Sequence, residues 1–168
     1  AGCTNKATET SSGAPGATPA ATAPPPALKL VEPPEPTAAI PSQPAKKAYK
    51  IGVSLYTQDD PFYQALRQGL EDQAGKDKVT LNITSADKNL NNQIDQLQNF
   101  VSQKVDAIIV CPVDSQGIIA AITAANKAGV PVFTADIASK GAKVVSQIAS
   151  DNVQGGRLVG DYVGKTLR

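Results

Sequence analysis

The alternation of apolar and polar positions divides the chain near residue 47. From residue 48 onward, short apolar runs are separated by longer stretches in which apolar residues recur every three or four positions. The first pattern is typical of buried strands and the second of amphipathic helices. Residues 1–47 show neither pattern. They are rich in Ala, Thr and Pro and lack aromatic residues, so they bury too little apolar surface to offset the entropy of ordering.

The regular part of the chain predicts five strands and four helices in alternation. We expect the strands over residues 49–55, 79–83, 106–111, 130–135 and 143–149, and the helices to begin near Pro61, Asn89, Ser115 and Asn152. Each crossover helix returns the chain to the same edge of the sheet. The fold class is therefore α/β, with a doubly wound parallel five-stranded sheet and helices on both faces.

Two details of the pattern concern burial. A spacing of four places Phe62, Leu66 and Leu70 on one face of the first helix. The third strand, 106–111, is apolar almost throughout, which predicts that other elements cover both of its faces.

Ligands of such sheets bind beyond the carboxyl ends of the strands, near the point where strand order reverses. We therefore look for function in the loops that follow the strands. No GxGxxG motif follows the first strand and no GxxxxGK[ST] motif occurs, so neither a dinucleotide site nor a phosphate-binding loop is expected.

Composition narrows the classes of function further. The formal net charge is +1, the chain has no His, and its two Cys residues are far apart. These features disfavour a basic nucleic-acid binder, a zinc enzyme and a Ser-His-Asp hydrolase. No apolar run approaches the roughly 18 residues that span a bilayer. We expect no enzyme, no cofactor and no metal site.

The loop after the first strand carries the most chemistry. Residues 56–63 hold two carboxylates and three aromatic rings. Carboxylates accept hydrogen bonds from sugar hydroxyls, and aromatic rings stack on the flat C–H faces of sugars. The alternative is structural: Asp60 only caps the helix, and Phe62 with Tyr63 packs beneath it.

Four segments of the chain resemble the periplasmic sugar-binding proteins of ABC transporters, close to the ribose-binding type. The resemblance rests on residues 50–69, 106–117, 129–136 and 146–165, and it spans essentially all of residues 48–168. It implies a two-lobed protein that binds a monosaccharide, a pentose or a hexose, and delivers it to the permease. Residues 48–168 would be the N-terminal lobe.

The resemblance also implies the ligand-binding residues. Asp60 and Asp136 would hydrogen-bond the sugar, Phe62 and Tyr63 would sandwich its ring, and Tyr56 and Cys111 would line the pocket. Two positions depart from the family pattern.

The first departure is Ile137, which stands where ribose binders have Arg. The second is Cys111, which stands where they have Asn. Both changes make the pocket less polar, so the pattern does not favour ribose itself. Cys111 is equally compatible with a small buried hydrophobe and with a ligand contact.

Several other polar residues are expected to have structural or solvated roles. Asp59 is expected in solvent, and Asp151 or Asn152 is expected to cap the last helix. The residues Gln93, Gln96 and Asn99 are expected on a solvent-exposed helix face and are assigned no role in a ligand site.

The two ends of the chain suggest a larger protein. Ala1-Gly2-Cys3 resembles the cleavage region of a bacterial lipoprotein, so we expect Cys3 to be lipidated and residues 1–47 to be a disordered tether; the alternative is a chance Cys. The absence of Met indicates a processed or truncated start. At the other end a helical pattern still runs at Arg168, which we interpret as a cut before the second lobe.

The expected function is that of an extracytoplasmic solute-binding lipoprotein of a sugar importer, held at the membrane only by its lipid and binding no nucleic acid. The main alternative is a lipid-anchored sugar sensor that presents its ligand to a chemoreceptor or histidine kinase. A repressor is disfavoured because residues 1–46 contain no basic helix-turn-helix, and a doubly wound enzyme because no nucleophile with its base is present.

Overall fold

A computed structural model describes residues 46–167 of the 168-residue chain. Cys3 and the predicted tether up to residue 45 lie outside the described residues. The elements are, in chain order, β1 (Lys50–Leu55), α1 (Pro61–Asp77), β2 (Thr80–Ser85), α2 (Leu90–Ser102), β3 (Ala107–Val110), α3 (Ile119–Lys127), β4 (Val132–Ala135), β5 (Gln147–Ile148) and α4 (Asn152–Thr166).

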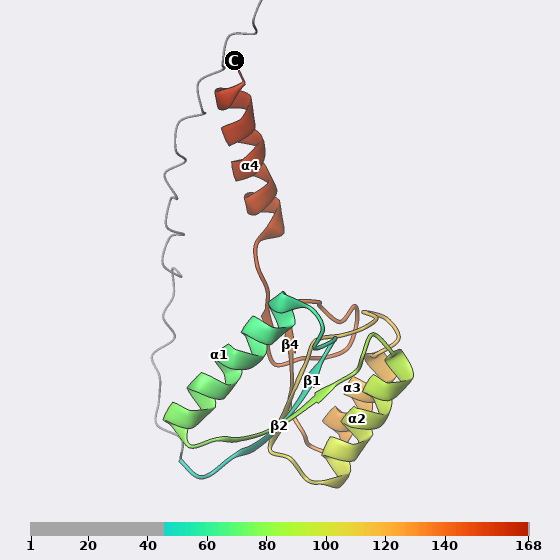
Figure 1. Ribbon diagram of the computed structural model, residues 1–168. Coiled ribbons are helices and arrows are strands. Elements are labelled where there is room, and N and C mark those ends of the chain that lie inside the picture. The colour runs from blue at the N-terminus through green and yellow to red at the C-terminus, as the bar shows by residue number, and fades with distance from the viewer. Residues whose placement is uncertain (1–45, 168) are drawn as a thin grey trace, which may run out of the picture. The chain divides into compact units, whose positions relative to one another are not determined.

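The strands form one sheet in the order β2-β1-β3-β4-β5, and all four pairings are parallel. Helix α1 lies on one face of this sheet, and α2 and α3 lie on the other (Figure 1). The predicted fold class is confirmed. Strand order reverses between β1 and β3, so the ends of these two strands flank the expected ligand position.

Side-chain alternation along the strands builds two apolar cores. On the α2 and α3 face, Ile108 and Val110 of β3 are buried among the side chains of both helices. On the α1 face, Val53, Leu55 and Cys111 pack with residues of the helix. The face of β3 toward α1 is less covered, because Ile109 is only partly buried. Both faces of β3 are therefore covered, as predicted, although the cover on the α1 side is less complete.

A close approach of helix to strand depends on Gly52. The ring of Phe100, on α2, lies directly against this residue of β1, and a Cβ atom at Gly52 would come within 2.5 Å of Phe100 Cγ. Real Cβ atoms do not approach other heavy atoms so closely. Glycine at position 52 therefore lets α2 pack tightly against the sheet.

Two element boundaries differ from the sequence prediction. Only Gln147 and Ile148 of the expected strand 143–149 pair with β4, although Val145 N also donates to Val132 O at 2.8 Å. Helix α3 begins at Ile119, later than predicted. Asp114 Oδ1 instead accepts hydrogen bonds from the backbone N–H groups of Gln116 and Gly117, and so stabilises a turn ahead of the helix.

Helix α4 forms where the sequence predicts it, with Asp151 as its cap: Asp151 Oδ1 accepts from Gln154 N at 2.9 Å. No described residue of α4 is buried. Its larger apolar side chains are exposed, namely Val153, Leu158, Val159, Tyr162 and Val163. Neither of the two cores includes a residue of this helix.

Candidate functional site

The carboxyl ends of β1, β3 and β4 adjoin at one edge of the sheet. Because β1 pairs with β3 and β3 with β4, all in parallel, the residues that follow these strands are neighbours. These residues are Tyr56 after β1, Cys111 after β3 and Asp136 after β4. We call this edge, together with the β1–α1 loop, the carboxyl-end rim. It brings together the predicted site residues from distant parts of the sequence.

Asp136 is held at three points. Its backbone N donates to Ile148 O at 2.8 Å, its carbonyl oxygen accepts from Gln147 Nε2 at 3.1 Å, and its Oδ2 accepts from the hydroxyl of Tyr63 at 2.8 Å. Its backbone adopts a left-handed conformation with φ 63°, which is uncommon for a residue other than glycine. The surrounding bonds thus fix both the backbone and one carboxylate oxygen.

Tyr63 lies in the first turn of α1 and is only 7% exposed. Its ring stacks on that of Tyr56 at a centroid distance of 5.4 Å, and Phe62 meets it edge-on at 5.0 Å. Burial, and then the hydrogen bond to Asp136, raise the pKa of Tyr63 well above its usual value. The hydroxyl therefore stays a neutral donor at physiological pH.

The two predicted stacking rings differ in access. Phe62 is 48% exposed at the rim, whereas Tyr63 is buried. The face of α1 that packs on the sheet is centred on Tyr63, Leu66 and Leu70. The structural alternative, in which both rings pack beneath the helix, therefore holds for Tyr63 and not for Phe62, which lines a hollow with Leu66. A sugar sandwiched between Phe62 and Tyr63 stays a prediction, and it requires one of the two rings to turn, because they meet edge-on at 5.0 Å.

Asp60 caps α1 and lies exposed at the rim. Its Oδ1 accepts from Phe62 N at 2.8 Å, and Pro61 follows it at the first helical position. Asp60 is therefore observed to cap the helix, and a hydrogen bond between Asp60 and a sugar stays a prediction. Asp59 is exposed, as expected. Arg67 Nη1 donates to Gln58 Oε1 at 2.6 Å and ties the loop to α1.

Cys111 is fully buried beneath the rim. Burial, and then the negative charge of Asp136, raise the pKa of the Cys111 thiol to about 12. The thiol is therefore protonated at neutral pH and offers a ligand only a weak hydrogen-bonding group.

Gln93 of α2 is a rim-supporting residue that the sequence analysis missed. It was expected on a wet helix face, but it is 0% exposed. Its Nε2 donates to Ser54 Oγ at 3.2 Å and to Cys111 O at 3.0 Å, and its Oε1 accepts from Val113 N at 2.8 Å. One side chain thus joins the ends of β1 and β3.

The signal for Gln93 is present in the sequence, because the residue lies on the apolar stripe of its helix, between Leu90 and Leu97. Gln96 is also partly buried: Ser54 Oγ donates to its Oε1 at 2.8 Å. Asn99 is exposed, as expected.

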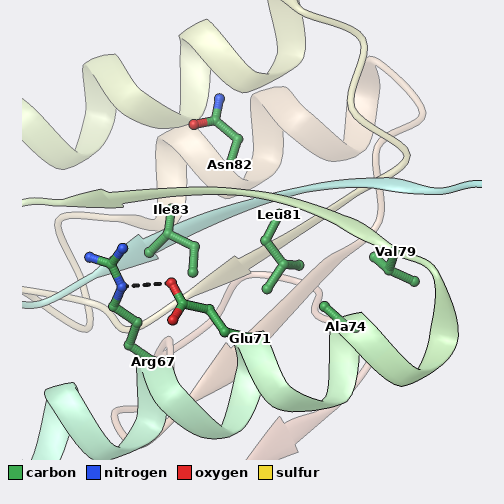
Figure 2. Close-up of a pocket in the computed structure, with 8 residues that line it drawn as sticks. Arg67, Glu71, Ala74, Val79, Leu81, Asn82 and Ile83 are labelled. Carbon is green, nitrogen blue, oxygen red and sulfur yellow. Dashed lines mark hydrogen bonds and ion pairs between the residues drawn. The ribbon is translucent and has the colours of Figure 1, made fainter.

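Two hollows of the surface compete as ligand sites. The larger, about 450 Å³, lies between α1 and β2 and contains the Arg67–Glu71 ion pair at 2.9 Å (Figure 2). The smaller, about 310 Å³, lies at the rim. It is lined by Phe62, Leu66, Ala135, Asp136, Ile148, Ala149 and Ser150. The rim hollow has the better chemistry for a sugar, because it joins an exposed ring to a fixed carboxylate.

Neither a metal site nor a membrane-spanning helix is found among residues 46–167. No group of three or more His, Cys, Asp or Glu side chains is placed to hold a metal ion. Within the same residues, no helix has both the length and the apolar character needed to cross a membrane.

Comparison with known proteins matches residues 51–168 to a family described as "Periplasmic binding protein domain". The ribose import binding protein RbsB of Bacillus subtilis is 36% identical over 122 residues, which make up 73% of this chain and 40% of that protein. The Caulobacter myo-inositol binding protein, solved with myo-inositol, is 34% identical with a TM-score of 0.66, and the match covers 74% of this chain and 42% of that one.

A solute binding protein of an ABC transporter from Mycobacterium smegmatis, solved with glycerol, is 32% identical with a TM-score of 0.67. That match covers 73% of this chain and 42% of that one. The chain thus spans about 40% of the length of the relatives that it matches.

Proposed function

Because the chain belongs to the type I periplasmic sugar-binding proteins, we propose that residues 48–168 supply the N-terminal lobe of a solute-binding protein for a monosaccharide. The resemblance predicted from the sequence is confirmed at the level of the family. The family consists of solute-binding proteins, which supports a binding role rather than a catalytic one. The ligand, the permease and the membrane anchor are the finer parts of the proposal.

One observation carries the proposed ligand class. Asp136 stands at the carboxyl-end rim, fixed by three hydrogen bonds, and the exposed ring of Phe62 lines the same hollow. A carboxylate beside an apolar ring matches a sugar, which combines hydroxyl donors with apolar C–H faces. The named ligands of the relatives, ribose and myo-inositol, support a pentose, a hexose or a related polyol.

We further propose that a second lobe closes over this rim and that the closed form is recognised by an ABC permease. Hinge closure of two lobes around a ligand is a common way to convert binding into a change of shape. The matches cover only about 40% of each relative's length, which supports the proposal of a second lobe. A sensor differs only in the protein that docks on the loaded lobe, so that alternative stays a prediction.

The proposed location is outside the cytoplasm, with a lipid on Cys3 and residues 1–47 as tether. The triplet Ala1-Gly2-Cys3 and the Pro-rich composition that follows support it. Metabolic labelling with an alkyne fatty acid tests the anchor in a bacterial host that expresses the gene. We expect the unsubstituted protein to carry the label and Cys3→Ser to lose it. Equal labelling of the two proteins would contradict the lipid anchor.

The ligand proposal is tested by titrating the ¹⁵N-labelled 168-residue chain with D-ribose, D-galactose and myo-inositol while recording amide spectra. We expect millimolar affinity, because one lobe supplies only part of the hydrogen bonds, and shifts confined to residues of the rim. A micromolar or tighter dissociation constant would contradict the need for a second lobe. Shifts centred on the hollow between α1 and β2 would contradict the assigned site.

A further inference from the structure

The carboxylate of Asp136 faces the rim without a cationic partner in the described residues. The described residues form two ion pairs, Lys47–Asp106 and Arg67–Glu71, and neither pair includes Asp136. The next residue in the chain is the apolar Ile137. Lys88 reaches the rim through its backbone, whose N–H donates to Tyr56 O at 2.9 Å.

Asp136 Oδ1 is the carboxylate oxygen that the hollow offers to a ligand. The Tyr63 hydroxyl donates its hydrogen bond to Asp136 Oδ2, so the Tyr63 oxygen can act only as an acceptor in any further hydrogen bond. Among the described residues, no hydrogen bond reaches Asp136 Oδ1. Cys111 is buried beneath the hollow rather than in its lining, and Ser150 is the one hydroxyl-bearing residue that lines it.

The remaining lining of the hollow is apolar: Phe62, Leu66, Ala135, Ile148 and Ala149. An apolar wall lowers the local dielectric constant, which strengthens any charge interaction that the carboxylate makes. It also disfavours a second negative charge, because no Lys or Arg side chain lines the hollow to compensate it.

We propose that this site prefers an amino-substituted sugar or polyol, whose ammonium group pairs with Asp136 Oδ1, over the matched neutral sugar, and that it rejects the matched sugar acid. The inference rests on the proposed function, since it names the ligand class of the same rim. It identifies Asp136 as the residue that determines charge specificity, and Tyr63 as the residue that positions it.

The expected size of the preference follows from the charge of the ligand. A sugar hydroxyl and an ammonium group both make a charge-assisted hydrogen bond to an ionised carboxylate, so the preference comes from the added attraction between opposite charges, which solvent partly screens in an open site. For the chain as it stands, we therefore expect the amino sugar to bind roughly threefold to tenfold more tightly than its parent.

The test uses matched trios: D-glucose, D-glucosamine and D-glucuronate, and the same three forms of D-galactose. The ¹⁵N-labelled 168-residue chain is titrated with each at about pH 6, where the amine is protonated. We expect the rim amides to shift with the amino sugar at lower concentration than with the neutral sugar, and not to shift with the acid.

Three variants separate the role of Asp136 from a general charge effect. Asp136→Asn is expected to remove the preference for the amine. Asp59→Asn removes an exposed carboxylate of the neighbouring loop and is expected to keep it. Ile137→Arg places a guanidinium beside Asp136 and is expected to favour the neutral sugar. Amide spectra of the free variants report whether each is folded.

The outcomes distinguish the inference from the proposed function. If neutral sugars shift the rim amides at the same or lower concentration than amino sugars, the charge preference is wrong and the proposed function stands. If amine preference persists in Asp136→Asn, the assignment to Asp136 is wrong. If no sugar of any charge shifts the rim amides, both the inference and the proposed function fail.

Discussion

The hydroxyl of Tyr63 donates a hydrogen bond to Asp136 Oδ2 at 2.8 Å, and so joins the first turn of α1 to the end of β4 across 73 residues of sequence. This bond connects the loop richest in aromatic residues with the carboxylate that we assign to the ligand. Tyr63 is buried by its packing on the sheet and on Tyr56, while its neighbour Phe62 is exposed. The orientation of the ligand-facing oxygen therefore depends on a residue of another element.

Replacing Tyr63 by Phe tests the strength of this bond. We expect Tyr63→Phe to lower the free energy of unfolding by about 1 kcal/mol, because the partly exposed carboxylate regains water in place of the hydroxyl. Urea unfolding measures the change. Tyr162→Phe, at an exposed position of α4, is the control and is expected to change nothing measurable.

The raised pKa of Tyr63 predicts a pH dependence. The folded-state pKa lies above the unfolded-state value of about 10. The contribution of Tyr63 to stability is therefore fully present below that value and declines as the pH rises above it. Stability of Tyr63→Phe should decline less steeply than that of the unsubstituted chain above about pH 10. Identical slopes would contradict the buried, bonded hydroxyl.

Gln93 offers a test of the support beneath the rim. Gln93→Ala leaves Ser54 Oγ, Cys111 O and Val113 N without their buried partner. We expect a loss of about 2 to 4 kcal/mol in the free energy of unfolding. Asn99→Ala, on the exposed side of the same helix, should cost less than about 0.5 kcal/mol. Equal losses for both variants would contradict the role of Gln93.

Gly52 tests the close packing of α2 on the sheet. Gly52→Ala places a Cβ within 2.5 Å of the Phe100 ring, and we expect it to destabilise the fold by about 1 to 3 kcal/mol. Gly69→Ala, in α1 with no heavy atom near its Cβ, should instead stabilise by about 0.5 to 1 kcal/mol. In a Phe100→Leu background the cost of Gly52→Ala should shrink, since the ring is gone.

The reactivity of Cys111 tests its burial. The thiolate is the reactive form, and burial raises the pKa of this thiol to about 12. Site-resolved mass spectrometry after iodoacetamide treatment at about pH 8 should find Cys111 unmodified in the native chain and modified in guanidinium chloride. Modification of the native chain at the rate of an unstructured peptide would show that Cys111 is accessible.

The fold follows from sequence patterns because strand and helix periods are local. The helix start at Pro61, with Asp60 as cap, is found as predicted. The length of β5 was not predictable from its apolar residues, since β2 and β5 each have a single neighbouring strand and yet six residues of β2 pair but only two of β5. The exposure of α4 was likewise not encoded in its helical pattern, which shows amphipathicity but not what covers the apolar side.

The site was predictable only in part, and the reason is that side-chain partners come from different elements. Asp136 and Tyr63 were both chosen from the resemblance, but the bond between them depends on how α1 packs on the sheet. Gln93 was assigned to solvent because Gln is a polar residue type, although its position lies on the apolar stripe of the helix. A polar residue at a core position needs a buried partner, and that rule would have identified Gln93.

The measurement that tests the central claim most directly is an amide-shift titration of two variants with D-galactose and D-galactosamine. Asp136→Ala removes the carboxylate at the rim, whereas Glu71→Ala removes the carboxylate in the hollow between α1 and β2. We predict that Asp136→Ala weakens binding at least tenfold, about 1.4 kcal/mol, and that Glu71→Ala leaves it unchanged. Unchanged binding in Asp136→Ala, or binding lost in Glu71→Ala, would contradict the assignment of the sugar site to the carboxyl-end rim.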